Sequence, residues 1–178
     1  MLGMLIYSIE LMLVSPELVK ILGAKSYWDS VYAVIPLITG GYFAFLYTLP
    51  AGIEYFFEKT SFIMIGTVCS AVVNIFLNFI FIPKYGYISA AYCTLVTYLL
   101  YFVFHYFLAR KLIGNYIFSN KFILAAIVVI LVANFIVVGT VNLIVIRWVC
   151  AIAIFMIALW LEEKNLGIIK KRILDRRL

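Results

Sequence analysis

The stretch that decides the fold is VVNIFLNFIFIPKYGYISAAY, residues 72–92. It is an apolar run that nevertheless carries two amides, Asn74 and Asn78, four residues apart. Residues at this spacing lie on the same face of a helix, so both amides project from one side of an otherwise aliphatic and aromatic segment. The run breaks at Pro83 and restarts on small residues after Gly86. We therefore expect two helices joined by a short turn, with a polar stripe on the first.

The composition of the whole chain indicates that lipid is its solvent. Of its 178 residues, 67% are hydrophobic and 12% are charged, and the mean hydropathy is +1.15. Soluble domains are about half apolar and about a quarter charged. A membrane-spanning helix needs roughly 20 apolar residues. Four stretches of 24 or 25 residues without a charge meet that length and predict an all-α, polytopic membrane helical bundle: 30–53, 60–83, 85–109 and 122–146.

The residues that could carry enzyme or metal chemistry are sparse. The three cysteines lie in apolar stretches without metal-ligand spacing, and His105 is the only histidine. No phosphate loop or zinc signature is present. A membrane polymerase or acyltransferase would need a substantial loop or a His/Asp pair, and His105 has no carboxylate near it in sequence. We therefore expect no enzyme activity, no metal, no cofactor and no nucleic-acid partner.

The hydropathy pattern predicts one lobe of about six transmembrane helices over residues 1–161, followed by a basic tail over 162–178. The first helix is expected to end at Ser15-Pro16-Glu17, which makes it too short for a crossing, so we interpret it as a longer helix that has lost its beginning. The tail is expected either to lie on the anionic inner leaflet as an amphipathic helix or to be solvated. The six predicted helices cover residues 2–14, 30–50, 61–82, 87–109, 121–138 and 143–161.

The distribution of Lys and Arg predicts the orientation. With six crossings, ten basic residues fall on the side of the N-terminus and four on the other side. Basic residues are enriched in cytoplasmic connections. Both termini are therefore expected in the cytoplasm. Arg147, near the start of the last helix, is expected to snorkel to the interface.

The clearest candidate functional feature is the polar stripe on the helix over 61–82. Its four members fall within an arc of about 80° at 100° per residue. One interpretation is a helix–helix contact, in which each amide contributes roughly 1 kcal/mol. The other is the lining of an aqueous cavity. Tyr101, on the next helix, carries a hydroxyl that needs a partner from a helix or a sugar. The stripe consists of Thr67, Ser70, Asn74 and Asn78.

The acidic residues supply the remaining candidates. Glu10 is a carboxylate well inside an apolar stretch, and such groups are expensive in lipid and frequently functional. We consider it a possible coupling acid for protons or cations. Glu54 and Glu58 are spaced i, i+4 and are followed by Lys59. We interpret these three residues as a cytoplasmic helix end, with a gating contact as the alternative.

Three stretches of the chain resemble the C-terminal half of the bacterial oligosaccharide flippases, which carry O-antigen and capsule units. This family belongs to the multidrug/oligosaccharidyl-lipid/polysaccharide exporter superfamily. The most specific of the three is an N-x-x-x-N helix that runs into I-P-x-Y-G and restarts on Ala-Ala. The resembling stretches are residues 15–43, 52–60 and 74–94.

The resemblance implies a membrane transporter in the bacterial cytoplasmic (inner) membrane. Such a protein moves undecaprenyl-pyrophosphate-linked oligosaccharides between leaflets by alternating access, during O-antigen or capsular polysaccharide synthesis. Its fold has two six-helix lobes, of which this chain would supply the second. The implied partners are the lipid-linked oligosaccharide, membrane lipids, and a missing N-terminal lobe or a second half-transporter. The alternatives are a cation-coupled multidrug-type exporter of the same fold or a non-functional truncated remnant.

Overall fold

The computed structural model of the chain describes residues 1–114 and 120–175, and for residues 161–162 and 165–175 it describes the backbone only. The described part is helical, and the all-α fold predicted from the sequence is confirmed. In chain order the elements are α1 (Leu2–Leu22), the short 3-10 helix η1 (Lys25–Ser30), α2 (Val31–Phe56), α3 (Thr60–Tyr85), α4 (Ile88–Ile113), α5 (Asn120–Gly139) and α6 (Ile144–Asp175).

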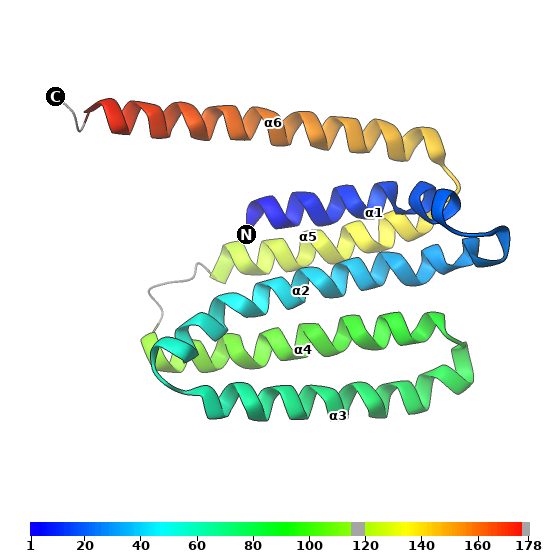
Figure 1. The fold of residues 1–178 in the computed structure, drawn as a ribbon, viewed down its shortest axis with the longest axis horizontal. Coiled ribbons are helices and arrows are strands. Elements are labelled where there is room, and N and C mark those ends of the chain that lie inside the picture. Colours follow the sequence, from blue (N-terminus) through cyan, green and yellow to red (C-terminus); the bar gives the residue numbers. More distant parts are fainter. Residues whose placement is uncertain (115–119, 176–178) are drawn as a thin grey trace.

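The six long helices alternate in direction and lie side by side (Figure 1). The N-terminus, the α2–α3 turn and the C-terminal end of α6 lie at one end of the array, called here the N-terminal end. The α1–α2, α3–α4 and α5–α6 connections lie at the opposite end. The short connections make sequence neighbours antiparallel, as is usual in helix bundles.

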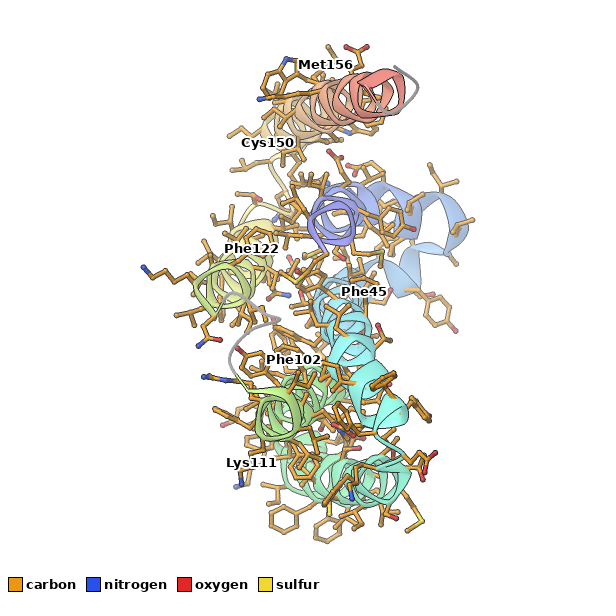
Figure 2. All side chains as sticks on the ribbon, turned by 90° about the vertical axis from the view of Figure 1, so that its left-hand side faces the viewer. Phe45, Phe102, Lys111, Phe122, Cys150 and Met156 are labelled. Atoms are coloured by element: carbon orange, nitrogen blue, oxygen red, sulfur yellow. The ribbon has the colours of Figure 1, made fainter. Side chains whose placement is uncertain are left out.

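The hydrophobic core lies in the middle of the array, and the two edge helices are largely exposed. Side chains of α1, α2, α4 and α5 form this core, in which Ile35, Phe43, Leu46 and Ile130 are fully buried. Viewed end-on, α3 and α4 lie at one edge and α6 at the other (Figure 2). Among the residues of α3, only Gly66 is buried. The array is therefore an open slab.

The chain is a multi-pass membrane protein by the length and apolar character of its helices. Five of them are long and apolar enough to cross a membrane: α1, α3, α4, α5, and η1 together with α2. The apolar part of α6, Ile144–Trp160, is shorter. The exposed aromatic and aliphatic side chains of α3 and α6 suit contact with lipid tails, because the hydrocarbon core of a bilayer is apolar.

The prediction that the first helix ends at Ser15 is wrong. α1 continues through Pro16 to Leu22 and has 21 residues, so the length argument for a shortened helix does not hold. Pro16 lacks the N–H that the carbonyl of Met12 would otherwise accept. The hydroxyl of Ser15 donates to that carbonyl over 2.8 Å instead. Prolines are tolerated in membrane helices where side chains satisfy the freed backbone groups in this way.

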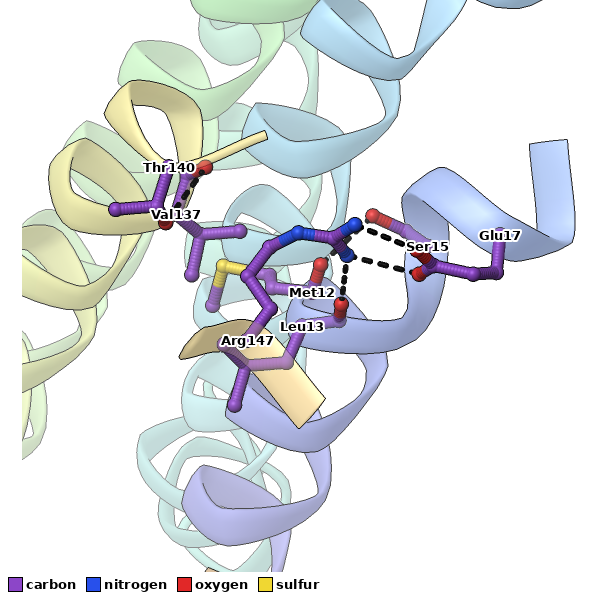
Figure 3. Close-up of polar contacts among 7 residues, drawn as sticks. All are labelled: Met12, Leu13, Ser15, Glu17, Val137, Thr140 and Arg147. Atoms are coloured by element: carbon purple, nitrogen blue, oxygen red, sulfur yellow. Dashed lines mark hydrogen bonds and ion pairs between the residues drawn. The ribbon is translucent and has the colours of Figure 1, made fainter. Parts of the chain in front are cut away.

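Arg147 does not snorkel to the interface as predicted; it joins α6 to α1 (Figure 3). Its guanidinium is 1% exposed. It donates to both carboxylate oxygens of Glu17, over 2.5 and 2.8 Å, and to the carbonyl of Leu13 over 2.6 Å. This bidentate geometry is the favourable arrangement for an arginine–carboxylate pair. Ser15 thus supplies the donor that Pro16 lacks, and Arg147 adds a further donor at the carbonyl of Leu13.

Two helix ends also differ from the prediction. α3 extends past Pro83 to Tyr85 and ends at Gly86. Gly86 has a positive φ of 74°, and its N–H donates to the carbonyl of Ile82, which closes the helix. α6 does not end near residue 161 but continues to Asp175. The amphipathic face predicted for the tail rests on side chains outside the described residues.

We predict that replacing Arg147 with Met destabilises the helical bundle, because it leaves Glu17 without its ion-pair partner and removes a donor to the carbonyl of Leu13. Removing one member of a buried ion pair typically costs about 3–5 kcal/mol. The thermal unfolding midpoint of the purified protein in detergent should fall clearly. Lys84→Met, at an exposed cation near the end of α3, is the control and should leave the midpoint nearly unchanged. Equal midpoints for the two variants would contradict the anchoring role of Arg147.

Candidate functional site

The most unusual polar site in the described chain is a buried pair formed by Glu54 and His105. Glu54 lies in the last turn of α2, and His105 lies on α4 beside it. Both side chains are 0% exposed. The imidazole Nδ1 lies 2.7 Å from one carboxylate oxygen and 2.9 Å from the other. Buried ionisable groups in membrane segments are costly and commonly mark functional sites.

The rest of the imidazole is enclosed by aromatic rings and by the backbone of α3. Tyr47, Tyr101 and Phe104 each present a ring to it, with centroids 4.9, 4.6 and 5.0 Å away. Its Nε2 is buried and has no hydrogen-bond partner among the described residues. On α3, a Cβ placed on Gly66 would come within 2.5 Å of Nε2. Glycine is therefore the residue that permits α3 to approach the ring so closely.

Glu54 lies at the end of α2, as the sequence indicated, but its carboxylate is buried, and its partner in space is His105, which has no carboxylate near it in sequence. The two residues are 51 positions apart, so proximity along the chain gave no signal. One signal was available. Each is the lone acid or lone histidine of an apolar stretch, and such groups tend to pair with each other in membranes.

Glu58 and Lys59 do form the helix end that the sequence indicated. The N–H of Lys59 bonds to the carbonyl of Glu54, and the N–H of Glu58 bonds to that of Tyr55. Glu58 has a φ of 57°. This is the Schellman ending of α2, with Glu58 in the left-handed position that glycine usually takes. Both side chains are exposed.

The polar stripe of α3 contacts α4. Thr67 shares a 2.8 Å hydrogen bond with the hydroxyl of Tyr101. Asn74 donates to Thr97 over 3.2 Å, and Asn78 donates back to Asn74 over 2.9 Å. Ser70 instead donates to the carbonyl of Thr67 within its own helix. Three of the four predicted stripe residues therefore form two separate sets of contacts with α4. Thr67 bonds to Tyr101, which itself contacts the His105 ring, and Asn78 reaches Thr97 through Asn74.

The stripe is only partly enclosed. Thr67 is exposed, while Ser70, Asn74 and Asn78 are half-buried. One groove of about 180 Å³ between α3 and α4 is lined in part by Gly66, Ser70, Thr97 and Tyr101. A larger groove of about 570 Å³ lies toward the α3–α4 turn and is lined mainly by apolar and aromatic residues, among them Phe81, Tyr85, Tyr92 and Cys93. Helix packing and groove lining, the two interpretations left open by the sequence, coexist here.

A second polar contact, which the sequence analysis missed, crosses the centre of the core. Asn134 of α5 donates to Thr39 of α2 over 2.8 Å, and Thr39 lies 3.5 Å from the sulfur of Met12 on α1. Asn134 is the one polar side chain in the middle of a very apolar helix, which was the available signal.

Glu10, the predicted coupling acid, does not join either buried pair. It is half-buried on α1, and its Oε1 has no hydrogen-bond partner within the described residues.

Comparison of the chain with protein-family models, with curated proteins and with solved structures found no match.

We predict that Gly66→Ala disrupts the α3–α4 contact, because the new methyl group would overlap the buried imidazole. The thermal unfolding midpoint should fall, by an amount corresponding to the roughly 1–3 kcal/mol typical of overpacked cores. The matched control is Gly41→Ala on α2, where a Cβ meets nothing within 4 Å. Alanine favours helix over glycine, so this control should be neutral or slightly stabilising. A neutral Gly66→Ala variant would show that α3 does not pack on His105.

Proposed function

We propose that this chain is one lobe of a membrane transporter that moves undecaprenyl-pyrophosphate-linked oligosaccharides between the leaflets of a bacterial cytoplasmic membrane. The observation that carries the proposal is the hydroxyl and amide stripe on α3, a helix at the open edge of the slab. Polar side chains at such an edge are costly against lipid. They are better accommodated if that edge faces a polar passage, formed with a second lobe.

The chemistry of the α3–α4 edge suits a substrate that is part sugar and part lipid. Thr67, Ser70 and the two asparagines offer donors and acceptors to sugar hydroxyls. The groove beyond them presents tyrosine and phenylalanine side chains, whose rings offer faces for sugars and apolar surface for an isoprenoid chain. The similarity of residues 74–94 to the oligosaccharide flippases falls on this same edge.

The charge distribution supports a defined orientation for this lobe. Lys59, Arg110, Lys111, Lys121 and Lys164 lie at or near the N-terminal end of the array. Lys20, Lys25 and Lys84 lie toward the other end, and Arg147 there is neutralised by Glu17. The excess of basic residues is expected on the cytoplasmic side. Glu54 and His105 would then lie toward the cytoplasm, and the large aromatic groove toward the periplasm.

The test is a flipping assay in proteoliposomes that hold the purified chain and a fluorescent undecaprenyl-pyrophosphate oligosaccharide. A membrane-impermeant quencher reports the fraction of label in the outer leaflet over time. We expect flipping above the protein-free background, with a second copy of the chain supplying the other side of the passage. Asn74→Leu and Asn78→Leu should each slow it about five-fold, which corresponds to the loss of about 1 kcal/mol of polar contact.

The matched controls are Phe76→Leu and Phe79→Leu, which change exposed residues on the other side of the same helix. They should leave the rate unchanged. If the wild-type chain flips no faster than empty liposomes, the proposal fails for the chain on its own. If all four variants slow flipping equally, the stripe has no special role in the passage.

A further inference from the structure

We propose that Glu54 and His105 form a proton-binding site in this lobe, which exchanges its proton through Nε2 of His105 at the side covered by Gly66. The site goes beyond the proposed function, because it requires no particular transported molecule. It also replaces Glu10 as the coupling group suggested by the sequence, because it has a second titratable residue and a defined enclosure.

The distances fix where one of the protons lies. Nδ1 is within hydrogen-bond reach of both Glu54 oxygens, so one proton is held between the imidazole and the carboxylate. A second proton on Nε2 makes the ring an imidazolium and the pair neutral overall. When Nε2 gives that proton to a water molecule, hydronium forms, the ring becomes a neutral imidazole, and the pair carries one net negative charge. The Nε2 proton is therefore the exchangeable one.

Burial makes both protonation states of the Glu54–His105 pair costly in free energy, which suits reversible binding of a proton. In the loaded state the N–H at Nε2 has no acceptor among the described residues, and an unsatisfied buried donor is costly. In the empty state the pocket holds a net charge, which is also costly away from water. Because both protonation states are costly, neither is strongly favoured over the other. Entry of water at Nε2 is then enough for the pair to gain or lose its proton.

Among the described residues, the titratable side chains in ring contact with His105 are tyrosines, which are neutral at ordinary pH. The titratable rings that face His105 are Tyr47 from α2 and Tyr101 from α4. From α3 the nearest contact is Gly66, with exposed Cys69 further along the adjoining groove. Glu58 and Lys59 are exposed in the turn after α2, and Arg110 lies more than one turn further along α4.

The route to the site is the groove of about 180 Å³ between α3 and α4. Gly66, Tyr101 and Phe104 line this groove and also cover the imidazole. The groove carries the hydroxyls of Ser70 and Thr97 as well, so water in it would have hydrogen-bond partners. α3 is an edge helix whose only buried residue is Gly66. A small displacement of α3 would therefore connect Nε2 with the groove.

The experiment uses the fact that His105 is the only histidine in the chain. The protein is purified without a polyhistidine tag, labelled with 15N-histidine, and placed in lipid nanodiscs. The imidazole 15N signals are followed between about pH 5 and about pH 8. We expect Nδ1 to stay protonated and hydrogen-bonded throughout, while Nε2 changes from protonated to unprotonated. A wild-type Nε2 signal that keeps one protonation state across this range would overturn the proposal.

Two variants test whether the carboxylate governs the site. Glu54→Gln removes the counter-charge, and a buried imidazolium without one is strongly disfavoured, so the ring should be neutral over the whole range. Glu58→Gln changes the exposed acid of the same helix end and should titrate like the wild type. Glu54→Gln behaving like the wild type would overturn the assignment. If Glu54→Gln does not fold, the wild-type titration alone decides. No lipid-linked substrate is present, so the result is independent of the flipping assay.

Discussion

The absence of water in a bilayer is the constraint on which the rest of this structure depends. Every backbone or side-chain polar group within the lipid must find its partner inside the protein. Where α1 passes Pro16, the hydroxyl of Ser15 donates to the carbonyl of Met12, which the proline leaves without an N–H donor. The same requirement explains why Asn134 reaches across the core to Thr39. Apolar contacts hold this slab together, but the polar contacts determine which helices are neighbours.

The two ion pairs of the described residues differ in their chemistry, although each leaves one buried nitrogen without a hydrogen-bond partner. Arg147 binds its carboxylate with two nitrogens and uses one of them again on a backbone carbonyl, so the pair is a well-matched anchor. His105 uses a single nitrogen, and the other faces a helix backbone without a partner. The Nε of Arg147 is also buried without a partner, but a guanidinium keeps its protons in proteins, whereas an imidazole nitrogen can gain or lose one. We therefore place function at the second pair and stability at the first.

Hydropathy and charge spacing predicted most of the fold, because they show directly which segments of the chain lie in lipid and which lie in water. The six helices and the turns at 86 and 140–143 follow from apolar length and from Gly and Pro positions. The extension of α1 past Pro16 was not predicted, because a proline usually ends a helix. In the structure the hydroxyl of Ser15 takes the place of the missing N–H. The α3 stripe was visible from helical periodicity, and its partners Thr97 and Tyr101 required the structure. The Glu54–His105 pair was missed because pairing was considered only between residues close in sequence.

The contact between Arg147 and Glu17 also sets an order of events during synthesis. Glu17 enters the membrane with the first helix, whereas its partner is 130 positions further along the chain. Until α6 is inserted, the carboxylate of Glu17 must remain hydrated or be held by the insertion machinery. α1 can therefore reach its final environment only after α6 has been made. A ribosome stalled before Arg147 would leave Glu17 without its counter-charge, at the end of the helix array opposite the N-terminus. Membrane quality control could recognise the incomplete protein by this unpaired acid.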